Sequence, residues 1–362
     1  MKKIVFCTLR DNKGATGGPG GVLYLQKTTL GDSINGVPCE YWFNTFSGGN
    51  PLKKWLNKII FSYKALVSKD TYFFTHDIVS GSVLAHLHKR YSLVFHHQGP
   101  CVEENRNLGG IKLAFIREKI MARQERRSFI HANTLHFPAN GAADMYFDSP
   151  LANCKREEVN VKPALYNIIP MVEPEKSAGI DIDADPSKIT LFSLGTLTVA
   201  KGQDRVVSFI EEHLNEFGKP VRYIMVGKGP LKDNLLNQLE SIKEKNSEFE
   251  YIYLPAVSHD DVMYLHKISD IYIMLHRISI FDFATLEAMS QKSAIILSKV
   301  GGNKDFDIDG NIIYAEDVDG GQVKLEAMDV CSLKDKNYEV FIKNFTKEPF
   351  IEQYRKFFSA VE

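Results

Sequence analysis

The sequence predicts two α/β domains, each built on a parallel sheet with crossover helices. Three observations favour this fold class. The chain has 362 residues, more than one ordinary core accommodates, and its 44% hydrophobic and 25% charged residues are typical of a globular protein. Short apolar runs alternate with helix-like segments along the whole length. The stretch Pro170–Lys188 is rich in Pro, Asp and Glu and lacks periodicity, which indicates an interdomain linker.

The N-terminal domain is predicted over residues 1–170. The apolar run after Met1 is too short for a signal peptide and Arg10 follows it at once, so it is interpreted as the first strand. Gly17–Gly21 is expected to form a loop after this strand, where glycine permits close backbone approach to a ligand. The strands expected in this domain are Ile4–Leu9, Tyr72–Thr75, Leu93–His96 and Thr134–Phe137.

The C-terminal domain is predicted over residues 186–345. Small or Gly-rich turns follow its strands, and ligands of open α/β sheets bind outside the carboxyl ends of the strands. The amphipathic segment Pro349–Val361 is expected to form a closing helix, so that residues 349–362 pack back onto the N-terminal domain. The strands expected here are Ile189–Leu194, Arg222–Val226, Tyr251–Leu254, Ile271–Leu275, Ala294–Leu297 and Asn311–Tyr314.

The charge is divided unevenly between the halves. Residues 1–170 carry 22 Lys and Arg against 13 Asp and Glu, whereas residues 171–362 carry 22 against 32. The basic half indicates an anionic substrate or surface. Five scattered cysteines without a CxxC pair favour a reducing compartment, with neither a disulfide framework nor a zinc site. No uncharged apolar stretch approaches the roughly 20 residues of a membrane span, so a cytoplasmic protein is expected.

Residues 52–69 form a predicted basic amphipathic helix. Its lysines lie on the face opposite an apolar stripe that includes Trp55, and the segment contains no acidic residue before Asp70. Such a helix could lie on an anionic membrane leaflet, in which case the protein would be peripheral on the inner face of the plasma membrane. It could equally be a surface helix packed on the N-terminal sheet. Phe61 falls on the basic face, and no nucleic-acid motif accompanies the charge.

Several linked motifs then carry a resemblance to a known family. They are LFSLGTLTVAKGQD (191–204), YIMVGKGPLKDNL (223–235), SDIYIML (269–275), FDFATLEAMSQKSAIILSKVGGNKDF (281–306) and FIEQYRKFF (350–358). In order and spacing these resemble the C-terminal domain of retaining glycosyltransferases of family 4. That family has the GT-B fold, two Rossmann-like domains facing across a cleft.

The resemblance implies transfer of a sugar from a UDP- or GDP-sugar to an acceptor hydroxyl with retention, without a metal or other cofactor. The implied acceptor is a saccharide or lipid-linked saccharide, and the implied setting is bacterial surface polysaccharide assembly such as O-antigen, lipopolysaccharide or capsule. Nucleic acid is not expected as a partner.

The resemblance also implies roles for individual residues. Lys201, just past a strand end, would hold the diphosphate, and Glu287, in the first turn of a helix beginning near Thr285, would accept bonds from the ribose hydroxyls. Backbone amides of the loop before that helix would face the phosphates and the sugar. From the N-terminal domain, Gly20 and Gly21 would close the phosphate pocket, and His97, preferred over His96, would face the sugar or the acceptor. The donor-binding set is Gly20, Gly21, Thr196, Lys201, Gly227, Phe281, Asp282, Phe283, Ala284 and Glu287, and the catalytic set is His97, Lys201 and Glu287.

The sequence also departs from the family pattern. Ser279 stands where the family has the first Glu of its Glu-x7-Glu pair, Thr196 replaces an Arg, and Ile280–Asp282 replaces Gly-Phe-Gly. Arg277 either supplies the missing cation or forms a surface salt bridge. Three alternatives therefore stay open: a degenerate non-catalytic partner protein, a GT-B sugar-nucleotide epimerase and, least favoured, a Rossmann dehydrogenase.

Two acidic motifs are weighed as metal sites. Asp305–Glu316 satisfies the EF-hand expression, but an apolar strand is expected inside it and the flanking helices are not, so calcium is disfavoured. Asp181, Asp183 and Asp185 alternate in the linker rather than at a strand end, which favours a solvated linker. No metal site is predicted.

Overall fold

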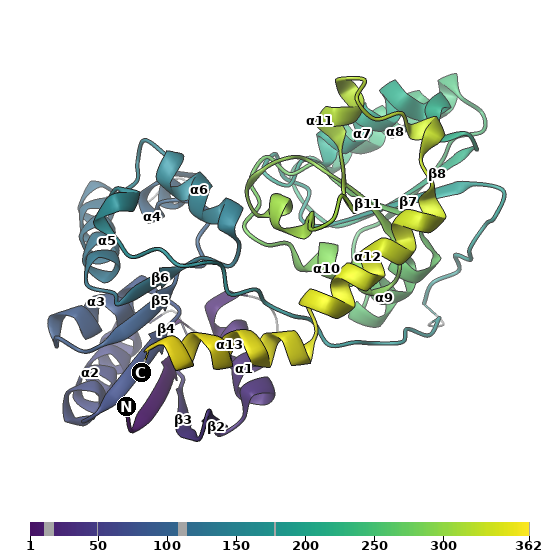
Figure 1. Cartoon of the computed structure of the whole chain (residues 1–362). Helices are drawn as coiled ribbons and strands as arrows, with labels where there is room; N and C mark the ends of the chain where they lie inside the picture. The colour runs from purple at the N-terminus through teal and green to yellow at the C-terminus, as the bar shows by residue number, and fades with distance from the viewer. Residues whose placement is uncertain (11–17, 49, 108–113, 177–178, 362) are drawn as a thin grey trace. The chain divides into compact units, whose positions relative to one another are not determined.

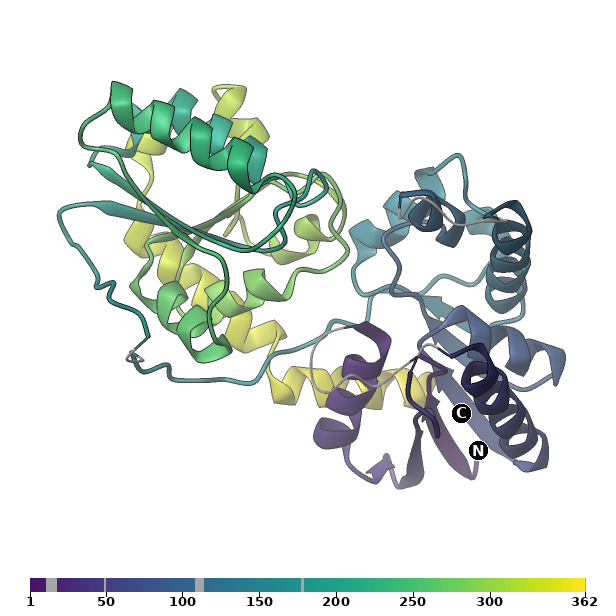
Figure 2. The same cartoon turned by 180° about the vertical axis from the view of Figure 1, so that it is seen from behind.

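The computed structural model describes residues 1–10, 18–48, 50–107, 114–176 and 179–361. These residues form two compact units, one made of residues 1–167 with 347–362 and the other of residues 168–346. Each unit contains a six-stranded sheet, and helices cover it (Figures 1 and 2). The α/β class with two parallel sheets is confirmed. Every helix among the described residues is too short or too polar to span a bilayer.

The sheet of the N-terminal unit has the order β2-β3-β1-β4-β5-β6 and is parallel except where β2 runs antiparallel to β3. The first strand, β1, therefore lies between β3 and β4, and the strand order reverses between β1 and β4. The elements of this unit are β1 (Lys3–Cys7), α1 (Gly18–Leu30), β2 (Ser33–Ile34), β3 (Val37–Trp42), α2 (Pro51–Val67), β4 (Thr71–Thr75), α3 (Ile78–His86), β5 (Tyr91–Val94), α4 (Cys101–Asn107), α5 (Ala114–Ile130), β6 (Thr134–His136), α6 (Asn140–Asp148), the 3-10 turn η1 (Arg156–Glu158) and α13 (Lys347–Val361).

The predicted Gly-rich loop is wrong for the part of it that the structure describes. Helix α1 already begins at Gly18, and Gly20 and Gly21 are buried in its first turn. The buried side chains Leu23, Gln26 and Leu30 recur at helical spacing, so the helix they define extends back into the glycines. Gly17 lies outside the described residues.

The two faces of this sheet are covered by different helices. Helices α2, α3 and α5 lie on one face, and α1 and α13 lie on the other (Figures 1 and 2). The closing helix α13 starts two residues before the predicted Pro349 and packs through aromatic side chains. Tyr354 lies 5.6 Å from Phe74 and Phe358 lies 5.8 Å from Phe6, ring centre to ring centre. The hydrophobic contact explains why the last residues fold with the first 167.

The sheet of the C-terminal unit has the order β12-β11-β10-β7-β8-β9 and is parallel throughout. The strand order reverses between β7 and β10. The elements of this unit are β7 (Ile189–Leu194), α7 (Gln203–His213), η2 (Leu214–Phe217), β8 (Val221–Val226), α8 (Lys232–Lys245), β9 (Glu250–Leu254), α9 (His259–Ile268), β10 (Ile271–Met274), α10 (Phe283–Ser290), β11 (Ala294–Leu297), η3 (Gly301–Phe306), β12 (Ile313–Tyr314), α11 (Ala315–Asp319), η4 (Leu325–Ala327) and α12 (Val330–Asn344).

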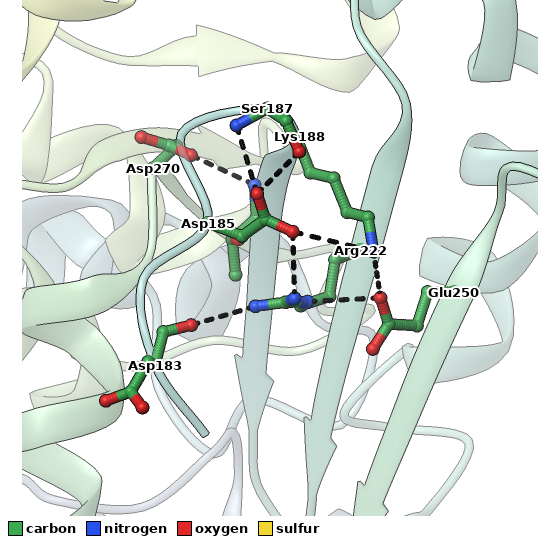
Figure 3. Close-up of polar contacts among 8 residues, drawn as sticks. Asp183, Asp185, Ser187, Lys188, Arg222, Glu250 and Asp270 are labelled. Carbon is green, nitrogen blue, oxygen red and sulfur yellow. Dashed lines mark hydrogen bonds and ion pairs between the residues drawn. The ribbon is translucent and has the colours of Figure 1, made fainter.

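The predicted linker is fixed to the C-terminal unit at the amino ends of its strands (Figure 3). Arg222, at the start of β8, donates to the carbonyl oxygen of Asp183 at 2.9 Å and lies 3.2 Å from the Asp185 carboxylate. Lys188 pairs with Asp185 and with Glu250 of β9. These aspartates therefore anchor the chain as it enters β7, and the expectation of a solvated linker is wrong at Asp185.

Glycine is required where the first two strands of the C-terminal sheet end. Gly227 has φ +151°, and a Cβ added there would lie 1.9 Å from the carbonyl oxygen of Gly195. Gly195 N in turn donates to Val226 O at 3.0 Å, so the two strand ends are in backbone contact. A side chain at position 227 could be accommodated only by moving one of these loops.

We expect Gly227→Ala to lower the free energy of unfolding by about 2–4 kcal/mol, because it combines a backbone clash with an unfavourable φ. Gly218→Ala is the matched control, since Gly218 has φ +71° but open space around its added Cβ. Its cost is expected to be about 1 kcal/mol from the backbone conformation alone. Urea unfolding of both variants measures the difference, and equal costs would contradict the predicted clash.

Candidate functional site

The candidate site lies at the carboxyl ends of β7 and β10, the neighbouring strands at which the C-terminal sheet changes direction. Ligands of open α/β sheets bind at such a switch point. Residues 195–202 lead from β7 into α7, and residues 275–282 lead from β10 into α10. Arg277 N donates to Ala200 O at 3.0 Å, and this hydrogen bond joins the two loops.

Lys201 and Asp282 form an ion pair at the centre of this site. Lys201 Nζ lies 3.1 Å from Asp282 Oδ1, and the lysine side chain is 32% exposed whereas the aspartate side chain is 11% exposed. Tyr272, on β10, donates its hydroxyl to Asp282 Oδ2 at 3.1 Å, and Thr285 Oγ1 lies 3.3 Å from the same oxygen. Both oxygens of the Asp282 carboxylate are thus in polar contact, and the ion pair fixes the position of the Lys201 ammonium group.

The ionisation of this cluster follows from burial and from the lysine. Burial alone would raise the pKa of Asp282, but the Lys201 ammonium, His276 and the hydrogen bonds together hold that pKa well below its usual value. Burial lowers the pKa of His276 to about 4, so this histidine is neutral at pH 7. Lys201 Nζ lies 3.3 Å from His276 Nε2, which accepts a hydrogen bond from the ammonium if the ring proton is on Nδ1.

Lys201 retains a donor for a ligand. An ammonium group has three N–H donors, and among the described residues only Asp282 and His276 lie within hydrogen-bond distance of it. The third N–H can therefore donate to an anionic oxygen without breaking the ion pair.

Glu287 occupies the second turn of α10 rather than the predicted first turn. The helix begins at Phe283, with Asp282 at the N-cap in an extended conformation, instead of near Thr285. Asp282 takes the N-cap position, although its side chain makes no capping hydrogen bond, and Thr285 becomes the third helical residue. Of the predicted loop Phe281–Ala284, Phe283 and Ala284 thus belong to the first turn of the helix.

The carboxylate of Glu287 is largely buried, with 14% of the side chain exposed. Burial, followed by the negative charge of Asp282, raises the pKa of Glu287 to about 7. Its oxygens lie 3.8 Å from His259 Nδ1 and 3.9 Å from His266 Nε2, beyond hydrogen-bond distance. Both contacts are therefore too long to satisfy the carboxylate, which is suited to accept hydrogen bonds from a ligand.

The remaining predicted residues of this unit line the same edge. Thr196 is exposed on the turn after β7, beside the backbone hydrogen bond from Leu197 N to Lys228 O at 2.9 Å. That bond places Thr196 next to Gly227 on the turn after β8. Phe281 differs from the other predicted donor-binding residues of this unit, because its ring is buried against Phe306, with 4.8 Å between the ring centres. This residue can therefore contribute only its backbone to a ligand.

The structure also shows the surroundings of Arg277 and Ser279, which the sequence analysis discussed with the departures from the family pattern. Arg277 binds Asp204 with both guanidinium nitrogens, at 2.8 and 2.7 Å, so it forms a salt bridge rather than a second cation beside Lys201. Ser279 is buried, and its hydroxyl has no hydrogen-bond partner among the described residues. A buried hydroxyl without a protein partner is suited to contact a polar ligand.

The predicted site residues of the N-terminal unit lie at the carboxyl edge of its own sheet or in α1. His97 follows β5, is partly buried and packs 5.0 Å from the Phe95 ring. His96 instead contacts His76, with Nε2 3.0 Å from His76 Nδ1. His76 Nε2 lies 2.8 Å from Gln26 Oε1, and Gln26 binds Tyr354 of α13. His96 is thereby held in a polar network with His76 and Gln26.

His76 and Asp77, which directly follow β4, also have structural partners. Asp77 caps α3 by accepting from Val79 N and Ser80 N, both at 2.9 Å, and it also accepts from Thr8 and Leu9 at the end of β1. It therefore ties two neighbouring strand ends together.

Sequence reasoning did not identify the side chains of Asp282, His276 and Tyr272 as one cluster. The available signal was an aspartate in place of the second glycine of Gly-Phe-Gly, together with a histidine directly after a buried strand. The ion pair with Lys201 joins residues that are 81 positions apart, and the sequence pattern alone does not reveal such a distant contact.

Among the described residues, neither acidic motif brings three ligand atoms within metal-binding distance of one another. Glu316, at the last position of the EF-hand expression, contacts Arg205 and accepts from Lys299 N at 2.9 Å. The group of described residues with compatible ligand spacing is Glu212, His213 and Asp319, which is partly exposed and in which His213 contacts Asp319 and Glu216.

Known proteins resemble this chain in sequence and in fold. Residues 180–348, just under half of the chain, match the sequence profile of the family described as Glycosyl transferases group 1. An uncharacterized glycosyltransferase of Methanocaldococcus jannaschii is 22% identical over 173 residues, which is 47% of this chain and 42% of that protein. The chain thus aligns with less than half of the length of this curated relative.

Solved structures match nearly the whole chain. Sucrose-phosphate synthase from Thermosynechococcus elongatus has a TM-score of 0.64 at 14% identity, and covers 99% of this chain and 100% of its own. HepE from Anabaena, solved in complex with UDP and glucose, has a TM-score of 0.63 at 13% identity with the same coverage. The chain has the GT-B fold. At these identities the structural likeness shows the GT-B fold alone, and the family match covers the segment that contains Lys201 and Glu287.

Proposed function

We propose that this protein is a retaining glycosyltransferase that moves a hexose-type sugar from a UDP- or GDP-sugar to an acceptor hydroxyl. The observation that carries the proposal is the grouping of Lys201, Asp282 and Glu287 at the switch point of the C-terminal sheet, inside the segment that matches the group 1 profile. The acceptor we propose is a saccharide or lipid-linked saccharide of a bacterial surface polysaccharide.

The proposed roles follow from charge and position. The third N–H of Lys201 and the amides at the start of α10 bind the diphosphate, and the Glu287 carboxylate accepts from the ribose hydroxyls. In the reaction the bond between the anomeric carbon and the phosphate oxygen breaks, and a bond to the acceptor oxygen forms on the same face. The acceptor proton passes to the departing diphosphate, whose growing negative charge Lys201 stabilises.

Asp282 and Ser279 account for the departures from the family pattern in this proposal. Asp282 orients Lys201, and the Ser279 hydroxyl contacts the sugar where the family has a carboxylate. Thr196 and Gly227 lie beside the nucleotide, while Gly20, Gly21 and His97 act from the N-terminal unit. Gly20 and Gly21 would do so as part of α1 rather than as a loop.

The experiment is a screen of UDP- and GDP-sugars with nucleoside diphosphate release as the readout, with and without added saccharide acceptors. The proposal expects acceptor-dependent release, and the anomeric proton coupling of the product tests retention. Nucleotide binding without release would indicate a degenerate partner protein. Conversion of the donor without any acceptor would indicate an epimerase.

Chelation tests the proposal that no metal takes part. We expect turnover with the identified donor to be unchanged by EDTA, because Lys201 and the start of α10 supply the positive charge for the leaving group. Readdition of Mg²⁺ or Mn²⁺ is the control. A rate that falls with EDTA and returns with either ion would contradict this expectation.

A further inference from the structure

Helix α2 presents its apolar stripe outward. Leu52, Trp55, Ile59, Tyr63 and Leu66 recur at helical spacing, and they are 62%, 58%, 44%, 66% and 59% exposed. A shallow hollow between Trp55, Ile59, Tyr63, Leu66 and Leu87 lies on this stripe. A continuous exposed apolar face is uncommon in a protein that has no partner for it.

The helix is attached to its unit by the opposite face. Asn57, Phe61 and Ala65 are its buried residues. Asn57 exchanges hydrogen bonds of 2.9 and 2.7 Å with the backbone of Phe46, and the Phe61 ring lies 6.1 Å from that of Trp42. Helix α2 is thus packed on its unit, but through the face on which the sequence places Phe61 and not through the larger apolar stripe. The outward stripe therefore contributes nothing to the core.

Lysines border the stripe on both sides. At about 100° per residue, Lys53 and Lys64 fall on one side of the stripe and Lys58 on the other. All three are exposed, and residues 51–67 contain no acidic side chain. Long lysine side chains can place their ammonium groups at lipid headgroups while the neighbouring apolar side chains enter the acyl boundary.

A second helix of the same unit repeats this composition. On α5, Phe115, Ile116 and Ile120 are 64%, 52% and 50% exposed, and Lys119 lies 4.0 Å from the centre of the Phe115 ring. The acidic Glu118 is mostly covered and pairs with Arg106. Helix α3 contacts both α2 and α5, and the three helices lie on the same side of the sheet (Figures 1 and 2).

We propose that the outward faces of α2 and α5 form a membrane-docking surface that binds an anionic lipid leaflet. The charge selects this occupant, because exposed lysines and arginines surround the apolar side chains on both helices, whereas a second copy of the same surface would bring like charges together. The proposal deepens the proposed function, since it would bring the N-terminal unit to a lipid-linked acceptor. Its test uses neither donor nor acceptor, so the two can fail separately.

The first experiment is co-sedimentation of the whole protein with vesicles. The wild type is expected to bind vesicles that contain phosphatidylglycerol, to bind phosphatidylcholine vesicles at least about tenfold less, and to be released by high salt. The double variants Trp55→Glu/Tyr63→Glu and Lys58→Glu/Lys64→Glu are each expected to reduce partitioning at least about tenfold. The matched controls are Ile342→Glu on α12 and Lys243→Glu on α8, both exposed positions of the other unit, and they should bind as the wild type does.

A second experiment locates the contact. Trp42 and Trp55 are the two tryptophans of the chain, so Trp42→Phe leaves Trp55 as the only indole reporter. Its emission should shift to the blue on adding phosphatidylglycerol vesicles, and brominated lipid should quench it. Circular dichroism of every variant checks that the fold is kept.

Three results would overturn the proposal. One is equal binding to neutral and anionic vesicles, and another is loss of binding in the control variants. The third is absence of vesicle binding together with a concentration-dependent dimer that Trp55→Glu/Tyr63→Glu dissociates, which would assign the surface to a second copy of the chain.

Discussion

Lys201→Ala is expected to lower kcat/KM for the sugar-nucleotide donor by about 10²–10³-fold, because it removes the side chain that we propose stabilises the leaving diphosphate. The ion pair with Asp282 is part of the reason for the size of this effect. It holds the ammonium at the end of β7, so little conformational freedom is lost when a phosphate binds. Steady-state release of the nucleoside diphosphate measures the change.

This variant also leaves the Asp282 carboxylate without its cation. Since the lysine is about one-third exposed, the loss in free energy of unfolding is expected to be about 1–2 kcal/mol rather than the larger cost of a fully buried pair. The double variant Lys201→Ala/Asp282→Asn separates the two effects. Its stability should recover, because the unpaired charge is gone, while its kcat/KM should stay low.

Lys245→Ala is the matched control, because Lys245 also forms an ion pair, with Glu211, but lies on the exposed end of α8. Its kcat/KM should equal that of the wild type. Full activity of the double variant would show that Lys201 only compensates Asp282 and has no role in catalysis.

The sequence predicted the parts of the C-terminal unit that depend on local pattern. Its strands are short apolar runs that end at small residues, so the position of Lys201 in the loop after β7 followed from the pattern of residues 189–202. Glycines reinforced this interpretation, since Gly195 and Gly227 have backbone conformations that other residues rarely adopt. Such signals are local and can be read without knowing what packs against them.

Contacts between distant segments were not available from the pattern. Asp282 could be read as a solvated loop residue until β10 and α7 placed it beside Lys201. Helix α2 is a second example. Its periodicity revealed an apolar face and a basic face, but not which of the two packs against the rest of the N-terminal unit. The choice depends on Phe46, which exchanges hydrogen bonds with Asn57, and on the ring of Trp42. The start of α10 was predicted near Thr285 but lies at Phe283, because Asp282 takes the N-cap position while its side chain is paired with Lys201.

Glu287→Gln is expected to raise the donor KM by about 30–100-fold, because a carboxylate accepts hydrogen bonds from ribose hydroxyls more strongly than an amide does. The pKa of about 7 adds a dependence on pH. Below pH 7 the wild-type carboxyl is protonated and accepts weakly, so the wild-type donor KM should fall as the pH rises through 7. The glutamine variant should lack this step, and a donor KM that varies with pH equally in both proteins would contradict the ribose contact.

The stability of the folded protein gives an independent check on Glu287. Ionisation of this carboxyl is expected to lower the stability, whereas it is expected to improve donor binding. The pKa of this carboxyl is raised from 4.5 in the unfolded chain to about 7 in the folded protein, so the folded state binds the proton more tightly. Below pH 4.5 both states are protonated and the shift has no effect. As the pH rises from 4.5 to 7 the folded state loses stability, by about 3 kcal/mol once the carboxyl is ionised in both states.

The variant Glu287→Gln removes this loss of stability. Urea unfolding should therefore find the variant close to the wild type at pH 5 and more stable at pH 8, with Glu244→Gln, on the exposed face of α8, as the control that shows no such gain. A glutamine variant that is less stable than the wild type at pH 8 would mean that the carboxylate is stabilised by the protein itself, and the argument that it is kept for a ligand would fail.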